Sequence, residues 1–325
     1  MEIGVHLLVG FNGTTLDGEL KALIRDFKVG GIVLFRRNVE SAGQLKALLD
    51  ETQAYAKERL GRFLWVAVDQ EGGPVQRLSQ HFTPLPSARD LALEGPQAIA
   101  EWTAKCARDL NHLGIQINLA PVLDVVSPEN PNFMEARSLG SDPQRVCELG
   151  SVWIEALQKN GVSATAKHYP GLGQATLDPH HFAPVIRWSG ADAMERDLLP
   201  FREAVKQGIH CFMTSHALYP DLDPEWPATL SPAVNRTLLR DRLKFEGVLL
   251  SDDMDMAAMC EKYSYGQMVR QGIQATIDFF LLCQRSENIE PFYRAFVDTV
   301  RGDASLQALI RESRARIEKL YGLHA

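Results

Sequence analysis

The chain has 325 residues, of which 45% are hydrophobic, and its formal net charge is −7. This length is long for one compact domain but lies within the range of α/β barrels, and the apolar content suffices for a large core. The negative charge and the lack of a Lys/Arg run argue against a nucleic-acid or anionic-membrane partner. No apolar stretch reaches the roughly 18 residues that a bilayer span requires.

The N-terminal sequence and the cysteines indicate where the protein works. MEIGVHLLVG has no basic segment before its short apolar run, so it predicts a first strand and not a signal peptide. The five cysteines are scattered and form no CxxC pair, which is typical of reduced thiols in a cytosolic protein. We expect a cytoplasmic protein, a monomer, with no cofactor and no metal site.

Short apolar runs alternate with longer amphipathic stretches along the chain. The runs predicted as strands are VHLLVG near Val5, GGIVLF near Gly30, FLWVAVD near Phe63, GIQINLAPVLD near Gly114, VSATAKH near Val162, HCFMTSH near His210, GVLLSDD near Gly247 and DFFLLC near Asp278. Stretches between them, such as LKALLDETQAYAKERL, place apolar residues three and four positions apart and predict helices. These eight units predict a single-domain (β/α)8 TIM-type barrel over residues 1–325, with a closing C-terminal helical region.

Polar side chains gather where the predicted strands end. In a parallel barrel these ends meet on one face, where barrel enzymes carry their active sites. The residues concerned are Arg36, Arg37 and Asn38 after the second strand, Asp69, Gln70 and Glu71 after the third, Asp124 after the fourth, Lys167 and His168 after the fifth, His216 after the sixth, and Ser251, Asp252 and Asp253 after the seventh. Scattered surface charge would not favour one end of nearly every strand, so the pattern favours an enzyme over a binding-only barrel.

The segment AKHYPGLGQATLDPHHFAPV, residues 166–185, is the densest in titratable groups. Its Gly and Pro residues predict a loop, so its polar groups need not serve a helix face or a strand ladder. Asp178 stands two residues before His180, and such an Asp can orient and polarise an imidazole for acid/base work near neutral pH. We therefore predict that this loop is part of an active site.

Five motifs follow one another in register along the chain. They are VDQEGGPVQRL (68–78), RSLGSDP (137–143), KHYPGLG with DPHH (167–173 and 178–181), ATLSP (228–232) and GVLLSDDMDM (247–256). Together they resemble family 3 glycoside hydrolases, and more closely the single-domain bacterial β-N-acetylhexosaminidases of peptidoglycan recycling. The resemblance implies a small oligosaccharide or muropeptide substrate and release of GlcNAc from GlcNAc-1,6-anhydro-MurNAc and its peptides.

The same resemblance implies a retaining displacement in two steps. Asp252 matches the nucleophile that forms a covalent glycosyl-enzyme, although an Asp here is also a common helix cap. Asp178 and His180 match the family's D-x-H dyad, in which the histidine is the acid/base and the aspartate orients it. His181 competes with His180 for this role, and either histidine also has a purely structural alternative.

We expect different roles for the basic and the acidic residues near Asp252. Lys167 and Arg137 are expected to favour its ionised form. Asp253 and Asp255 are expected to cap a helix or to lie on the surface.

Sugar-binding positions carry over from the resemblance in the same way. They are Asp69, Arg77, Arg137, Lys167 and His168. Charged donors and acceptors suit sugar hydroxyls, because a desolvated hydroxyl left unpaired costs roughly 1–3 kcal/mol. The alternative for Arg77 and Arg137 is a structural ion pair with Glu71 or Glu135. Glu71 and Asp124 are expected to support the site without an assigned role.

The chain departs from the family pattern at three places. Leu172 replaces the histidine of the usual PGHG, and Pro179 replaces a small residue within the D-x-H motif. Both lie on the loop expected to close over the substrate, so they bear on loop movement and leaving-group preference. The segment of residues 275–282, ATIDFFLL, lacks the glycine usual before the last strand, which indicates a structural difference.

Other functions remain open at this point. A β-glucosidase, β-xylosidase or glycoside phosphorylase would use the same barrel, and a histidine acid/base does not repel a phosphate acceptor. A carbohydrate-binding barrel without turnover is the alternative outside the enzyme class. A metal-dependent hydrolase would need a cluster such as His168, His180 and His216, but no HxH or HExxH spacing supports one.

Overall fold

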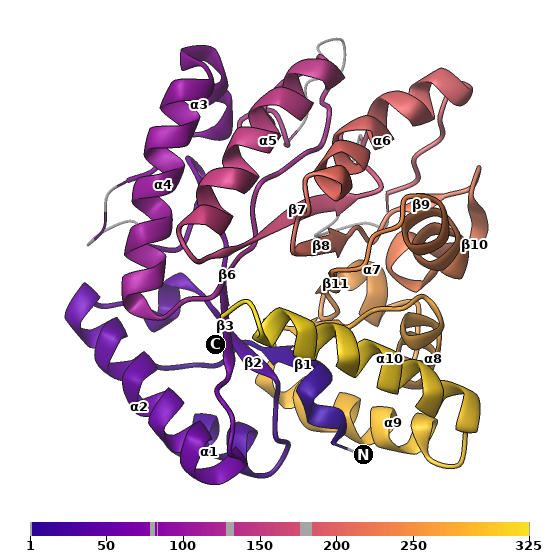
Figure 1. The fold of residues 1–325 in the computed structure, drawn as a ribbon. Helices are drawn as coiled ribbons and strands as arrows, with labels where there is room; N and C mark the ends of the chain where they lie inside the picture. Colours follow the sequence, from indigo (N-terminus) through magenta and orange to yellow (C-terminus); the bar gives the residue numbers. More distant parts are fainter. Residues whose placement is uncertain (1, 79–81, 83, 128–132, 176–183, 325) are drawn as a thin grey trace.

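Eight parallel strands close into a barrel in the computed structural model, which describes residues 2–78, 82, 84–127, 133–175 and 184–324. Their order around the barrel is β1-β12-β11-β8-β7-β6-β3-β2 (Figure 1). The barrel strands are β1 (Leu7–Val9), β2 (Gly31–Leu34), β3 (Trp65–Val68), β6 (Ile117–Asn118), β7 (Ser163–Tyr169), β8 (Cys211–Thr214), β11 (Val248–Asp253) and β12 (Phe279–Leu282). Each coincides with one predicted apolar run, with β7 extending one residue beyond it to Tyr169, so the predicted (β/α)8 barrel is confirmed.

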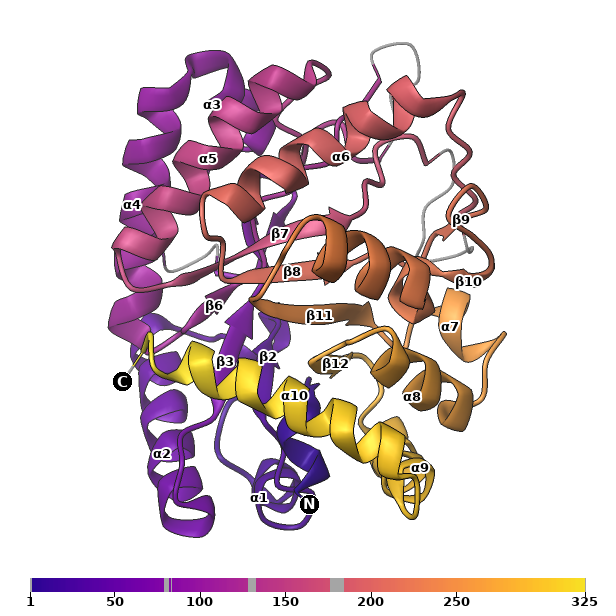
Figure 2. The same cartoon turned by 45° about the vertical axis from the view of Figure 1, so that its right-hand side comes forward.

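Helices connect consecutive strands and surround the barrel (Figures 1 and 2). The connecting helices are α1 (Gly18–Arg25), α2 (Ala42–Leu60), α3 (Ala88–Glu94), α4 (Pro96–Leu113), α5 (Pro143–Lys159), α6 (Ala191–Lys206), the π-helix η4 (Ala233–Arg242), α7 (Ala257–Cys260) and α8 (Tyr265–Gln274). Their starts follow ordinary capping chemistry: Ser41 begins α2 with a capping box, and the Asp142 side chain caps α5 ahead of Pro143. The predicted helical stretches are therefore confirmed.

Strand residues alternate between two hydrophobic clusters. Trp65 and Ala67 of β3 point into the barrel, whereas Val66 and Val68 pack outward against the helices. The barrel interior is consequently a filled core and not a channel, as expected for eight strands. β6 has two residues, but backbone bonds to β7 continue beyond it, from the N–H groups of Thr165 and Lys167 to the carbonyls of Ala120 and Pro121.

The C-terminal helices α9 (Ile289–Val300) and α10 (Ala304–Tyr321) follow the last strand. Figure 2 shows α10 crossing the barrel, and its Ile317 and Leu320 pack against the core inside it. Asp278, fully buried just before β12, forms ion pairs at 2.9 Å with Arg240 of η4 and at 2.9 Å with Arg316 of α10. These contacts attach α10 over the N-terminal ends of the strands and leave the opposite face open.

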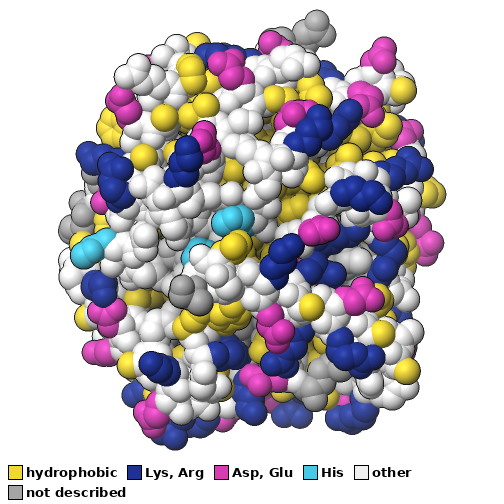
Figure 3. Space-filling view, in the orientation of Figure 1, with side chains coloured by type: hydrophobic (Ala, Val, Ile, Leu, Met, Phe, Trp, Pro, Cys, Tyr) yellow, Lys and Arg dark blue, Asp and Glu magenta, His cyan; other side chains and the backbone are white. Residues whose placement is uncertain are grey.

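The state of the cysteines and the distribution of surface charge agree with what the composition indicates. The five cysteines are free, as predicted. Acidic and basic side chains are interspersed over the face drawn in Figure 3. Among the helices that the structure describes, none has the length and apolar character that a membrane crossing would require.

The missing glycine before the last strand leaves a strained residue. Thr276 has a φ of 63° and is buried, and this left-handed conformation is a genuine outlier for a β-branched residue. An L-residue pays roughly 1–2 kcal/mol there. Glycine would adopt the same angle freely but loses roughly 0.5–1 kcal/mol of chain entropy on folding.

We therefore expect Thr276→Gly to raise the free energy of unfolding by about 0.5–1 kcal/mol. Urea unfolding followed by circular dichroism measures the change. Thr299→Gly, within α9, is the control and should lower stability, because glycine is unfavourable inside a helix. Destabilisation by Thr276→Gly would show that the threonine hydroxyl or methyl group contributes more than the strain costs.

Candidate active site

A cavity opens at the C-terminal end of the barrel, on the face opposite α10. Its volume is about 170 Å³. The lining residues include all five predicted sugar-binding residues and the predicted nucleophile: Asp69, Arg77, Arg137, Lys167, His168 and Asp252. The structure therefore brings together side chains from β7, from β11 and from the segments that follow β3 and β6, which are far apart in the sequence.

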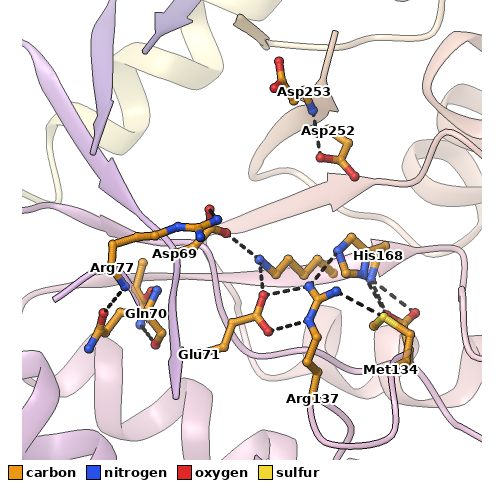
Figure 4. Close-up of polar contacts among 12 residues, drawn as sticks. Asp69, Gln70, Glu71, Arg77, Met134, Arg137, His168, Asp252 and Asp253 are labelled. Atoms are coloured by element: carbon orange, nitrogen blue, oxygen red, sulfur yellow. Dashed lines mark hydrogen bonds and ion pairs between the residues drawn. The ribbon is translucent and has the colours of Figure 1, made fainter. Parts of the chain in front are cut away.

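Cations and carboxylates alternate along one side of this cavity. Lys167 Nζ lies 2.8 Å from Asp69 Oδ1 and 2.6 Å from Glu71 Oε1. Arg137 binds both oxygens of Glu71 at 2.8 Å, and Arg77 Nη2 donates to Asp69 Oδ2 at 3.2 Å. Figure 4 shows Asp69, Glu71 and Arg137 in one row. We call these five residues the charge row.

The charge row holds its members in their ionised forms. Burial acts to raise the pKa of Glu71, but Lys167 and Arg137 outweigh it and lower that pKa to about 2. Lys167 and Arg77 likewise lower the pKa of Asp69 despite burial. Burial opposes the charge of Lys167, yet Asp69 and Glu71 together raise its pKa. The row therefore presents fixed charged donors and acceptors to a bound polar ligand.

His168 continues the row through a buried aspartate. Its Nδ1 donates to Asp124 Oδ2 at 2.8 Å, which leaves Nε2 as an acceptor 3.4 Å from Arg137 Nη2. The N–H of Leu172 donates to Asp124 Oδ1 at 2.6 Å. Asp124 thus orients a predicted sugar-binding side chain and also holds the segment after β7, which extends to Tyr169, so the first four residues of the predicted 166–185 loop belong to the strand. Leu172, at the family's histidine position, lines the cavity with an apolar side chain.

Asp252 stands apart from the charge row. It lies at the end of β11, and Figure 4 shows it separated from the row, with no dashed line joining the two. The N–H of Asp253 donates to Asp252 Oδ1 at 2.7 Å. Burial acts to raise the pKa of Asp252, but the imidazoles of His216 and His168, with Lys167 and this N–H bond, lower it below its usual value. The carboxylate is thus ionised and faces the cavity, as a nucleophile requires.

Two expectations about its acidic neighbours are wrong. Asp253 and Asp255 are buried and neither caps a helix, because α7 begins later with Met256 as its N-cap. Asp253 Oδ1 accepts the N–H groups of Asp255 and Cys283. Asp255 instead accepts N–H groups from residues 284 and 285. Burial and the neighbouring Asp255 charge raise the pKa of Asp253 to about 7. Both side chains hold the segment after β12 from buried positions, and Asp253 also lines the cavity.

The structure also decides between the two ion-pair alternatives for Arg137. Its partner is Glu71, whereas Glu135 lies 3.8 Å from Arg89 on the surface. The pairing does not remove Arg137 from the site, because the guanidinium still lines the cavity. Lys167 contributes to lowering the pKa of Asp252 as expected, but His216 and His168 contribute more.

Several strand-end residues have structural roles. Arg37 donates to the carbonyls of Phe11 and Cys283, and Asn38 donates to that of Phe11. Arg36 binds the carbonyl of residue 76. The shared signal of a strand end therefore identifies the correct face of the barrel but does not separate ligand-facing groups from groups that join loops.

The predicted dyad, Asp178 and His180, lies outside the described residues, as do Pro179 and His181. Within the described part of the chain, no group of three or more His, Cys, Asp or Glu side chains is placed to hold a metal ion. The described geometry combines an ionised carboxylate with a row of hydroxyl-binding groups across a small cavity. Such an arrangement suits nucleophilic displacement at a sugar carbon.

Comparison with known proteins identifies the family. Residues 5–320 match the glycosyl hydrolase family 3 N-terminal domain. A β-hexosaminidase of Pseudomonas aeruginosa is 33% identical over 288 residues, which cover 87% of this chain and 84% of that protein. A β-hexosaminidase of Thioalkalivibrio sulfidiphilus is 35% identical over 295 residues, which cover 86% of this chain and 81% of that protein.

Solved structures agree with the sequence relatives. A family 3 β-N-acetylglucosaminidase from Paenibacillus sp. superposes with a TM-score of 0.94 at 33% identity, covering 99% of this chain and 62% of that one. This chain therefore spans less than two thirds of that protein. A β-N-acetylhexosaminidase from Beutenbergia cavernae gives a TM-score of 0.92 at 29% identity, covering 99% and 97%. The chain thus belongs to glycosyl hydrolase family 3 and is a glycoside hydrolase.

Proposed function

We propose that this glycoside hydrolase is a retaining exo-β-N-acetylglucosaminidase. The observation that carries the proposal is the ionised Asp252 facing the charge row across the cavity. Action at a nonreducing end is what the resemblance of the five motifs implies. The names of the relatives, β-hexosaminidase and β-N-acetylglucosaminidase, support an N-acetyl sugar.

In the first step, a carboxylate oxygen of Asp252 attacks the anomeric carbon while the bond to the departing oxygen breaks. His180 gives its proton to that oxygen, and Asp178 orients the imidazole and stabilises its charged form. In the second step His180 takes a proton from water, whose oxygen attacks the anomeric carbon and releases Asp252. The roles of the dyad rest on the D-x-H pattern in the sequence.

The charge row is proposed to bind the sugar hydroxyls. Asp69 accepts hydrogen bonds from sugar hydroxyls, while Lys167, Arg77 and Arg137 donate hydrogen bonds to hydroxyl oxygens. His168 lies at the end of the row. Each side chain already has a fixed partner, so little side-chain entropy is lost when the sugar binds. Preorganised donors and acceptors of this kind favour one orientation of the ring.

We further propose peptidoglycan fragments, GlcNAc-1,6-anhydro-MurNAc and its peptide-bearing forms, as the natural substrates. The support is the resemblance of the five motifs to enzymes of peptidoglycan recycling.

Replacement of the nucleophile tests reaction, sugar and residue together. We expect the wild type to cleave 4-nitrophenyl β-N-acetylglucosaminide and the muropeptide fragment but not the matching β-glucoside. Asp252→Ala should lower kcat by at least about 10⁴-fold, the scale seen when a nucleophile is removed. Asp298→Asn, on the exposed surface of α9, is the control and should leave the rate unchanged. Cleavage of the glucoside alone would reject the proposed activity.

Replacement of the acid/base should depend on the leaving group. With a sugar or alkyl leaving group, His180→Ala should lower kcat/KM by roughly 10²–10⁴-fold, because the departing oxygen needs a proton. With 4-nitrophenolate, which leaves without protonation, the loss in the first step should be much smaller. His181→Ala is the matched control. A larger leaving-group effect for His181→Ala would assign the acid/base role to that residue.

The pH dependence follows from the two ionisations that the mechanism requires. Because the pKa of Asp252 is lowered, kcat/KM should fall on the acidic side of the profile only below the ordinary carboxyl pKa of about 3.9. The basic limb should lie at or above about 6.5, because Asp178 favours the imidazolium form of His180. His180→Ala should remove that basic limb. An acidic limb well above pH 4 in correctly folded protein would contradict the ionisation assigned to Asp252.

A further inference from the structure

Regular pairing of the seventh barrel strand stops before the nucleophile. β11 pairs with β8 at Val248, Leu249 and Leu250, opposite residues 211, 212 and 213. On its other side, Leu250 pairs with residue 279 and Asp253 with residue 281. Three steps along β11 therefore match two along β12, which defines a bulge at residues 251–253. Asp252 lies within this bulge, where the backbone ladder does not fix its position.

Side chains replace the missing ladder on both sides of the bulge. His216 Nε2 lies 3.0 Å from the carbonyl oxygen of Asp253. Continued register would place these two residues opposite each other, since each stands three beyond the last pair. On the β12 side, Ser251 Oγ accepts the N–H of Leu281 at 3.0 Å, and Asp253 Oδ1 accepts that of Cys283 at 3.0 Å. The bulge is thereby held from both neighbouring strands.

The ATLSP motif supplies the partner that orients His216. Thr229, in the short 3₁₀-helix η3 (Ala228–Leu230), has its Oγ1 2.8 Å from His216 Nδ1. The carbonyl of Asp253 can only accept, so Nε2 donates to it. The Thr229 hydroxyl donates to the carbonyl of Ser215 at 2.9 Å, so its oxygen accepts from His216 Nδ1, and both ring nitrogens carry a hydrogen. Both side chains are buried, His216 with 1% exposure. His216 is not among the described residues that line the cavity.

We propose that His216, oriented by Thr229, is a positioning residue for the nucleophile Asp252. The inference rests on the proposed role of Asp252. His216 holds the carbonyl of Asp253, whose N–H in turn donates to Asp252 Oδ1 at 2.7 Å. The contact thus fixes where the carboxylate stands relative to the anomeric carbon. A misplacement of about 1 Å at a reacting group costs about 10²-fold in rate.

The test compares variants that remove or keep each bond. His216→Leu and Thr229→Val should lower kcat for 4-nitrophenyl β-N-acetylglucosaminide by about 10²-fold. KM should change little, because the charge row is intact. His216→Gln can still donate an N–H near the Nε2 position, and Thr229→Ser keeps the hydroxyl, so each should recover most of the loss. Thr103→Val removes a buried hydroxyl of α4 that has no hydrogen-bond partner among the described residues, so it is the control and should match the wild type.

A second readout separates this inference from the proposed function. A 5-fluoro glycosyl fluoride of GlcNAc should label Asp252 covalently, and mass spectrometry of the peptide gives the labelling rate. No label on Asp252 in the wild type would reject the covalent mechanism itself. If the wild type is labelled and folded His216→Leu and Thr229→Val are labelled equally fast, or if only KM rises, the positioning role is wrong. Melting temperatures identify any variant that fails to fold. If His216→Leu does not fold, the comparison of Thr229→Val with Thr229→Ser decides the inference.

Discussion

Burial of the Lys167 ammonium is the constraint on which this site depends. The side chain is 2% exposed, and an unpaired charge at that depth would cost several kcal/mol. Asp69 and Glu71 provide the neutralising carboxylates, but two buried carboxylates beside one ammonium leave an excess of negative charge. Arg77 and Arg137 offset it, and the alternating row results. Each member is fixed by its neighbours, so loss of any one leaves a buried partner uncompensated.

The charge row also explains why Asp252 is free to react. Its cations are bound by Asp69 and Glu71, so none forms a direct ion pair with Asp252 among the described residues. Nearby imidazoles and the ammonium lower the pKa of Asp252 through the field they create, without occupying the oxygen that faces the cavity. The Asp252 carboxylate is therefore both ionised and free to attack. A closer cation would favour the charge but would lower the nucleophilicity of the carboxylate.

The sequence predicted the barrel, its strands and the strand-end residues Asp69, Lys167, His168 and Asp252 of the cavity, because apolar runs and the polar groups at their ends are local signals. The assignment of Arg77 and Arg137 to the site came from the resemblance of the motifs and not from such a signal. It did not predict which carboxylate pairs with Arg137, since Glu71 and Glu135 are distinguished only by the path of a loop between strands. Asp253 and Asp255 were expected to cap a helix or to lie on the surface because Asp is common at helix starts, but α7 begins later and both carboxylates accept backbone N–H groups instead. The strain at Thr276 is likewise invisible without backbone angles, although the missing glycine was a signal.

The bulge in β11 shows why the ends of barrel strands suit catalysis. Within the barrel, ladder partners satisfy the backbone N–H and C=O groups, and side chains there serve packing. Beyond Leu250 the ladder is interrupted, and buried backbone groups must find other partners. His216, two residues beyond β8, and Ser251 of β11 take that role, so the same bonds that satisfy the backbone also hold Asp252. The irregular strand end thus provides a rigid nucleophile whose carboxylate still faces the cavity.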